Sequence, residues 1–97
     1  KPVISHYWDK IPLDVDVLIT HGPLYGVGDF VPYKNGEYVG CRDLLDKISS
    51  LEQLKYNIFG HIHYSYGEVF KYNKTFLNVS CCNEAYEPIQ KPILIEI

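Results

Sequence analysis

The chain has 97 residues, enough for one small domain, and a formal net charge of −3. Hydrophobic residues make up 46% of it, which argues against a disordered chain. Lysine and arginine are not clustered, which argues against a nonspecific nucleic-acid binder. No apolar run is long enough to span a bilayer, and there is no signal-peptide pattern, so we expect no membrane association.

Cysteine usage favours a reducing compartment. Cys41, Cys81 and Cys82 are odd in number and two of them are adjacent, which is not typical of a disulfide framework. We therefore predict a cytoplasmic location. The sequence contains no methionine, even at position 1, and we interpret it as an excised or processed piece of a longer protein.

The first part of the chain predicts one strand and one long loop. Residues 5–10 favour a turn of helix that Pro12 would end. Residues 15–20 alternate and then become apolar, which predicts a strand buried on both faces. Residues 21–40 hold five glycines and two prolines, typical of a functional loop. Within this loop, Asn35-Gly36 predicts the turn of a hairpin over residues 33–38.

The second part predicts a helix followed by strands. Residues 41–54 form the clearest helix, with Asp43 near its start and one apolar stripe made of Leu44, Leu45, Ile48, Leu51 and Leu54. Strands are then predicted at 56–60, at 66–72 and 75–80 as a hairpin turning at Asn73-Lys74, and at 92–97, with residues 81–91 irregular. This β-α-β-β-β order predicts an α/β or α+β unit.

Three histidines follow predicted strands. His21 follows residues 15–20, and His61 and His63 follow residues 56–60, with Gly60 letting the backbone turn. Ligands bind outside the carboxyl ends of strands in open α/β sheets, and a helical crossover would make these two strands neighbours. Imidazole is the commonest metal ligand, so the pattern predicts one shared metal site.

Other interpretations of these residues remain open. His61 and His63 could be unrelated loop histidines, and His6 is expected on the surface. Cys81 or Cys82 could complete a closed zinc site, although they lack the C-x-x-C spacing. Asp29 could contact substrate or metal, or be a solvated turn carboxylate, beside a close-approach loop at residues 26–28.

Several short motifs, in this order, carry a family resemblance: Thr20-His21-Gly22-Pro23, Gly26-Val27-Gly28-Asp29, Gly40-Cys41, Phe59-Gly60-His61-Ile62-His63 and Tyr66-Gly67. From about Ile11 to the end, including Asn78 and the closing Pro-Ile-Leu run, the chain resembles the C-terminal half of calcineurin-like metallophosphoesterases. Within them it is most similar to the small metallophosphoesterase-domain phosphodiesterases.

The resemblance implies a four-layer α/β/β/α sandwich with two divalent metal ions, Mn²⁺, Fe or Zn²⁺. It implies that His21 and His61 bind one metal and His63 the other. Paired metals about 3.5–4 Å apart clamp a phosphate and activate a bridging water, whose hydroxide attacks phosphorus. Gly22, Asp29 and Gly60 are the implied substrate-binding residues. The implied reaction is hydrolysis of a phosphodiester or phosphomonoester in a small-molecule substrate.

The chain also departs from that family. The D-x-H, G-D and G-N-H motifs of the family's N-terminal half do not occur, and Tyr64 stands where relatives often carry Glu or Gly. Residues 1–97 are therefore interpreted as a partial domain without a complete catalytic set. We expect the isolated chain to be inactive and to self-associate through exposed sheet surface.

Two rival functions are weighed against the phosphoesterase. A non-catalytic metal-binding or interaction module would hold one metal or none, and one tightly held zinc with four protein ligands would favour it. A histidine-triad nucleotidyl hydrolase would need a third alternating histidine, and position 65 is serine.

Overall fold

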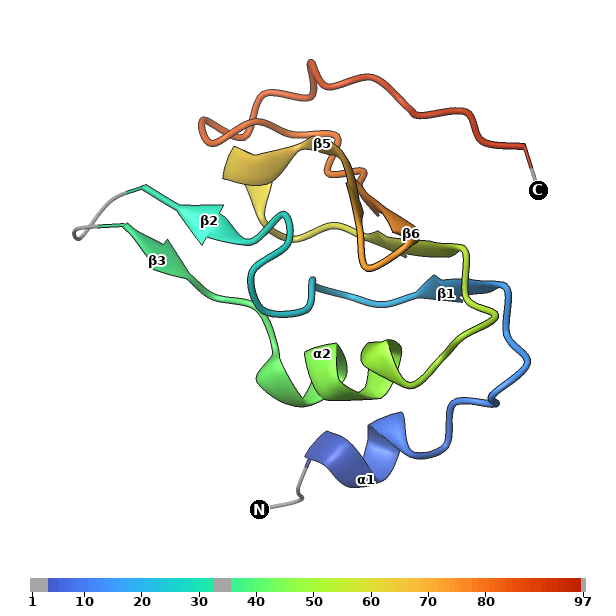
Figure 1. The fold of residues 1–97 in the computed structure, drawn as a ribbon. Helices are drawn as coiled ribbons and strands as arrows, with labels where there is room; N and C mark the ends of the chain where they lie inside the picture. The colour runs from blue at the N-terminus through green and yellow to red at the C-terminus, as the bar shows by residue number, and fades with distance from the viewer. Residues whose placement is uncertain (1–3, 33–35, 97) are drawn as a thin grey trace.

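A four-stranded, mostly parallel sheet forms the centre of the molecule, seen in Figure 1 of the computed structural model, which describes residues 4–32 and 36–96. The strand order is β1-β4-β6-β5. Strands β1 (Val17–Ile19), β4 (Tyr56–Phe59) and β6 (Lys74–Asn78) are parallel, and β5 (Gly67–Lys71) is antiparallel to β6. The sheet with its helices confirms the α/β class.

Two helices, α1 (Ile4–Trp8) and α2 (Arg42–Ser49), pack together on one side of this sheet (Figure 1). Helix α2 is shorter than predicted. The Ser49 and Ser50 hydroxyls donate to the carbonyls of Leu45 and Lys47, a pattern that competes with helix continuation. Of the predicted apolar stripe, Leu44 and Ile48 are buried on the helix and Leu45 is partly buried, while Leu51 and Leu54 are buried beyond its end.

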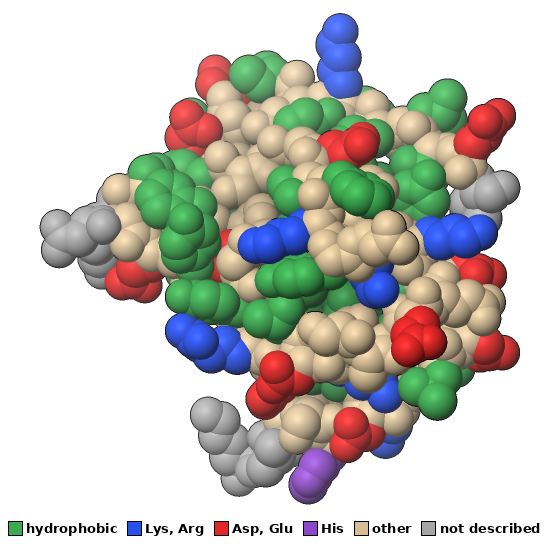
Figure 2. Space-filling view, in the orientation of Figure 1, with side chains coloured by type: hydrophobic (Ala, Val, Ile, Leu, Met, Phe, Trp, Pro, Cys, Tyr) green, Lys and Arg blue, Asp and Glu red, His purple; other side chains and the backbone are tan. Residues whose placement is uncertain are grey.

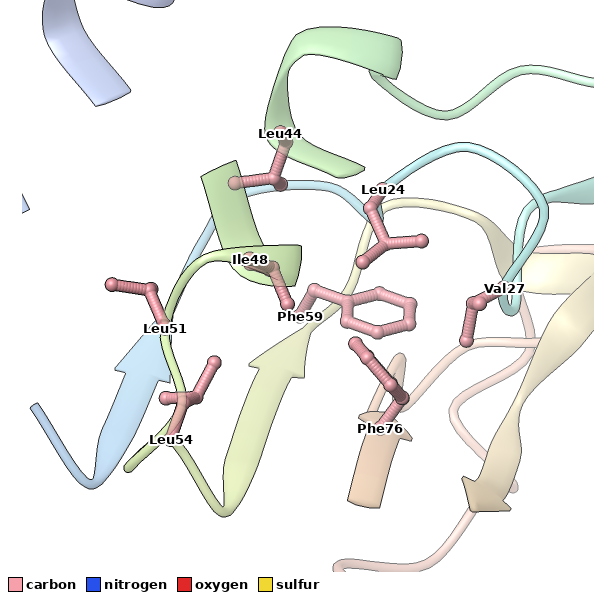
Figure 3. Packing of buried hydrophobic residues seen from close by; sticks show 8 residues of the cluster. All are labelled: Leu24, Val27, Leu44, Ile48, Leu51, Leu54, Phe59 and Phe76. Carbon is pink, nitrogen blue, oxygen red and sulfur yellow. The ribbon is translucent and has the colours of Figure 1, made fainter. Parts of the chain in front are cut away.

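The core lies between α2 and the sheet and contains Leu24, Val27, Leu44, Ile48, Leu51, Leu54, Phe59 and Phe76. In Figure 3 the ring of Phe59 from β4 lies among Leu24, Ile48 and Phe76. Burying each such side chain stabilises the fold by about 1.5–3 kcal/mol. Leu24 and Val27 belong to the long loop after β1, so this loop is anchored in the core.

The long loop also forms the predicted hairpin. Strands β2 (Phe30–Val31) and β3 (Glu37–Tyr38) pair antiparallel, while residues 33–35, on which the predicted turn falls, lie outside the described residues. At Gly28, with φ of 64°, an added Cβ would lie 2.9 Å from Cζ of Phe59. The close approach predicted for this loop is therefore present.

The hairpin of β5 and β6 turns one residue earlier than predicted. Tyr72 and Asn73 have φ values of 54° and 60°, and Lys71 pairs with Lys74 across them. Two successive positive φ angles are typical of the turns that match the twist of paired strands. The turn therefore lies on Tyr72-Asn73, not on Asn73-Lys74.

The prediction of a final strand at 92–97 is wrong for the described residues 92–96, which do not pair with any strand. Pro92, Ile93 and Ile95 lie instead across the face of the sheet opposite α2, over Ile58 and Leu77. The Tyr56 hydroxyl donates to the Glu96 carbonyl at 3.4 Å, and the Tyr66 hydroxyl donates to the Lys91 carbonyl. Residues 92–96 therefore lie against the face of the sheet instead of pairing as a strand at its edge.

Two further expectations differ from the structure. Strand β1 is not buried on both faces, because it lies at an edge of the sheet and Ile19 is 74% exposed. The β-α-β-β-β order and the four-layer sandwich are not confirmed, since the described chain also contains α1, the β2–β3 pair and the 3₁₀ turn η1 (His63–Ser65). Among the described residues, no helix has the length and apolar character needed to cross a bilayer.

Candidate metal centre

His21 and His61 lie side by side at the carboxyl ends of the neighbouring strands β1 and β4. Their ring centroids are 4.6 Å apart and the ring planes are tilted by 38°. Backbone hydrogen bonds continue beyond the strands, from Thr20 N–H to the Ile58 carbonyl at 3.0 Å and from Gly60 N–H to the His21 carbonyl at 3.2 Å. The predicted adjacency of the two strands is confirmed, and it brings two exposed imidazoles together.

The sharp turn after β4 falls on His61, not on Gly60 as predicted. His61 has a φ of 72°, a left-handed conformation that costs a residue with a side chain about 1–3 kcal/mol. A Cβ added to Gly60 would lie 3.6 Å from Oγ of Ser80, and one added to Gly22 would lie 4.0 Å from Cδ2 of His61, both ordinary contacts. The strain at this site is therefore carried by the histidine itself.

His63 is held by a different part of the chain. Its Nδ1 lies 3.1 Å from the carbonyl oxygen of Asn83, and its ring meets the ring of Tyr86 edge-on at 5.2 Å. A carbonyl only accepts, so Nδ1 carries the proton and Nε2 keeps its lone pair in the neutral ring. Metal-binding histidines commonly donate their second ring N–H in this way.

Asn78, at the end of β6, fixes the backbone between His61 and His63. Its buried Nδ2 donates to the carbonyls of Ile62 at 2.7 Å and Gly28 at 3.3 Å, and its Oδ1 accepts from Ser80 N–H at 3.1 Å. Sequence reasoning named Asn78 only within the family resemblance. A polar residue ending an apolar strand was the signal that could have identified it.

Asn57 braces β1 against β4 below His21. Its side chain is fully buried, and Nδ2 donates to the Leu18 carbonyl at 3.0 Å and to Oγ1 of Thr20 at 3.2 Å. Thr20 in turn donates to the Gly22 carbonyl at 2.8 Å. The two strand ends that carry His21 and His61 are thus joined by side chains as well as by backbone. Sequence reasoning did not identify this role of Asn57.

Two hollows meet at His61. One, of about 580 Å³, is lined by His61, His63 and Glu84 among others, and the second, of about 310 Å³, by His21, Gly22 and His61 among others. His21 and His63 therefore line different hollows. Among the described residues, His61, Val39 and Ile62 border both.

The described residues contain no group of three or more His, Cys, Asp or Glu side chains arranged to hold a metal ion. Of the three histidines predicted to converge, His21 and His61 thus lie together and His63 lies apart from them. Neither Cys81 nor Cys82 completes a metal-binding group with the pair. Neutral imidazoles fit Mn²⁺, Fe or Zn²⁺ in kind but are too few for a complete site. Their assignment as metal ligands stays a prediction.

Asp29 is not a solvated turn carboxylate. Its side chain is fully buried, and Oδ2 accepts from Gly26 N–H at 2.9 Å and Gly40 N–H at 2.8 Å. Its Oδ1 has no hydrogen-bond partner. Backbone amides have replaced water around this carboxylate, so it ties the two ends of the long loop together. Its assignment as a substrate-binding residue stays a prediction.

Comparison with known proteins gives consistent matches in sequence, although no family model matches the chain. The chain is 42% identical over 90 residues to metallophosphoesterase domain-containing protein 1 of Homo sapiens and to the Mus musculus protein of the same name, covering 93% of this chain and 27% of each relative. It is 35% identical over 96 residues to a UPF0046 protein of Caenorhabditis elegans, covering 97% of this chain and 34% of that relative.

The chain thus spans about a quarter to a third of the length of these relatives. The matches extend over nearly all of this chain. The family resemblance drawn from the sequence motifs is confirmed, and the chain is a homologue of the metallophosphoesterase domain-containing proteins.

Proposed function

We propose that this chain supplies imidazole ligands to a metal-dependent phosphoesterase that hydrolyses a phosphodiester or phosphomonoester bond in a small molecule. The observation that carries the proposal is the His21–His61 pair, with ring centroids 4.6 Å apart at the ends of two parallel strands. The names of the relatives point to the same class of protein. Ligand sites at the carboxyl ends of parallel strands are general in α/β sheets.

The chain's own residues would position the ligands. The Gly60–His21 backbone hydrogen bond and the buried Asn57 hold together the two strand ends that carry His21 and His61, and the Asn83 carbonyl keeps Nε2 of His63 available. When bound, two divalent ions such as Mn²⁺, Fe or Zn²⁺ would polarise a phosphoryl oxygen and activate water. The hollow of about 580 Å³ beside His61 and His63 is large enough for a small phosphate ester.

The ligand set of the chain is incomplete for that reaction. The described residues offer no carboxylate beside the His21–His61 pair, and a dinuclear centre needs bridging and general-acid groups. We propose that residues outside this chain provide them in a protein of the relatives' length. The 97-residue chain alone would then bind metal weakly and hydrolyse nothing.

Calorimetric titration of the chain with Mn²⁺ tests the ligand assignment. His21→Ala and His61→Ala should each weaken binding at least tenfold, because each removes one of two adjacent donors. His6→Ala is the matched control, since His6 is an exposed histidine on α1 and should leave binding unchanged. Equal affinities for all three variants and the original chain would contradict the assignment.

An assay with bis-p-nitrophenyl phosphate and Mn²⁺ tests the activity. The chain alone should show no turnover above the rate of the metal in buffer. Robust turnover that His63→Ala abolishes would contradict the proposed inactivity and leave the phosphoesterase class intact. One tightly bound zinc with four protein ligands and no turnover would instead favour a non-catalytic metal-binding or interaction module.

Self-association through exposed sheet surface is a further part of the proposal. Ile19 of β1 and Phe70 of β5 are 74% and 69% exposed, and Figure 2 shows hydrophobic side chains among charged ones on one face. Exposed apolar side chains on edge strands favour pairing with another chain. Light scattering should show concentration-dependent dimers that Ile19→Lys weakens, and a clean monomer at high concentration would contradict this.

A further inference from the structure

Two adjacent thiols occupy the segment that follows β6. Cys81 is exposed and Cys82 half-buried, both are free, and their sulfur atoms lie 3.9 Å apart. A disulfide bond has a length of about 2.0 Å, so the two sulfur atoms need to approach by only about 2 Å to bond. Neither thiol takes part in the candidate metal centre.

The backbone around these thiols is bound by Gln90 and continues directly to the residue that contacts His63. Gln90 donates from its backbone N–H to the Cys81 carbonyl at 3.0 Å and from Nε2 to the Cys82 carbonyl at 2.8 Å and the Ser80 carbonyl. Asn83, the residue after Cys82, accepts through its backbone carbonyl a hydrogen bond from His63 Nδ1–H at 3.1 Å. A change in the backbone at Cys81-Cys82 is therefore one residue away from the carbonyl that binds the His63 ring nitrogen.

We propose that Cys81 and Cys82 are a redox-modification site, at which a peroxide converts the two thiols into a disulfide between neighbouring residues and thereby releases His63 from Asn83. This inference does not depend on metal binding or on phosphoesterase activity. It assigns a chemical role to the adjacent cysteines that the candidate metal centre leaves unused.

The reaction balances with one peroxide. The Cys81 thiolate attacks a peroxide oxygen, so that an S–O bond forms, the O–O bond breaks and the leaving hydroxide takes a proton to become water. The Cys82 sulfur then attacks the Cys81 sulfenic acid, an S–S bond forms, the S–O bond breaks and a second water leaves. Two electrons pass from the sulfurs to the peroxide. Partial burial, followed by the hydrogen bond and charge of Cys81, raises the pKa of Cys82, which favours Cys81 as the first thiol to react.

The geometry of neighbouring cysteines makes this disulfide reversible and coupled to the backbone. Cα atoms of adjacent residues are about 3.8 Å apart, less than the about 4.4–6.8 Å usual for a disulfide, so the bond is strained and easily reduced. The ring that closes includes the Cys81-Cys82 peptide group, whose Cys81 carbonyl accepts from Gln90 N–H, and it is followed directly by the Cys82 carbonyl, which accepts from Gln90 Nε2. Closing it reorients those carbonyls, breaks the Gln90 hydrogen bonds and displaces Asn83.

Mass spectrometry of the chain treated with stoichiometric hydrogen peroxide tests the bond. The peptide that holds both cysteines should lose two hydrogen atoms, and dithiothreitol should restore them. Cys41→Ser is the matched control and should behave like the original chain, while Cys81→Ser and Cys82→Ser should not form the bond. Oxidation only to sulfonic acid, or disulfides only between chains, would overturn the proposal.

Nitrogen-15 NMR of the histidine rings tests the coupling to His63 in the same sample, reduced and oxidised, so no variant has to fold. The Nδ1 resonance of His63 should lose the shift of a protonated, hydrogen-bonded nitrogen on oxidation and regain it on reduction. His21 and His6 should not change. A disulfide that forms while the His63 resonance stays the same would overturn the release of His63.

Discussion

The His21–His61 junction and the His63 anchor hold imidazoles in opposite ways. The junction continues two hydrogen-bonded parallel strands and is braced by the buried Asn57, whereas the His63 ring contacts the Asn83 carbonyl and the Tyr86 ring, both in the irregular segment after β6. Regular backbone fixes the start of a side chain through many hydrogen bonds shared with the sheet, while contacts from an irregular segment fix it only as firmly as that segment is held. We therefore expect a rigid pair and one adjustable histidine.

The largest effect is expected where both regions are joined, at Asn78. Asn78→Ala should lower the free energy of unfolding by about 3 kcal/mol, because it removes the hydrogen bonds from Nδ2 to the Ile62 and Gly28 carbonyls and leaves Ser80 N–H without its Oδ1 acceptor. Urea denaturation measures this. Asn73→Gly, at an exposed turn residue with φ of 60°, is the control and should change stability little. Equal losses in the two variants would remove Asn78 as the link between the regions.

The next effect concerns the brace of the junction. Asn57→Ala should cost about 2 kcal/mol, because it removes two hydrogen bonds at a fully buried position. Gln53→Ala is a matched control, since Gln53 also donates two hydrogen bonds, to the Asp14 carbonyl and to Asp16, but at the surface. The control should cost less than about 1 kcal/mol. A smaller loss for Asn57→Ala than for Gln53→Ala would show that the junction needs no brace.

A smaller effect, confined to His63, is expected at Asn83. Its Oδ1 accepts from Ala85 and Glu87 N–H, and Nδ2 donates to Glu87, so the side chain shapes the turn that presents its carbonyl. Asn83→Ala should lower stability by about 1 kcal/mol and disturb the His63 ring resonances. The resonances of His21 and His61 should stay in place. Perturbation of all three histidines would mean that the regions are not separate.

The smallest effect is a gain in stability. His61→Gly should raise the free energy of unfolding by about 1 kcal/mol, because glycine adopts the φ of 72° without strain. His21→Gly, at a position without a positive φ, should instead lower it by about 0.5–1 kcal/mol. Thermal unfolding of both variants gives the comparison. A loss at His61 equal to that at His21 would show that the turn carries no strain.

The same contrast explains which features the sequence could predict. Strands β1, β4, β5 and β6 follow from apolar periodicity, and the position of His21 and His61 follows from where two parallel strands end. The hairpin of the long loop followed from Asn-Gly chemistry. The burial of Asp29 could not be predicted in this way. Its hydrogen-bond partners are the backbone amides of Gly26 and Gly40, and every non-proline residue has such an amide, so the sequence does not single these two out.

Prediction failed mainly where tertiary contacts decide the backbone. Residues 92–96 have the composition of a strand, but covering Ile58 and Leu77 on the sheet face competes with pairing at an edge. The left-handed turn fell on His61 although Gly60 was beside it, because conformational freedom does not determine where a turn is needed. The carbonyl that orients His63 comes from a segment without periodicity, and only the folded chain reveals it.

The buried Asp29 separates the β2–β3 hairpin from the interior. Its carboxylate binds the amides of Gly26 and Gly40, and its own carbonyl accepts from Val39 N–H at 3.2 Å, so the loop is closed at its base. Residues between Asp29 and Val39 can be replaced, or further residues inserted among them, without changing the packing of Leu24 or Val27. Val31 and Glu37 of the hairpin line the hollow beside His63. The wall of this hollow can therefore change while the closed base of the loop keeps Leu24 and Val27 in the core.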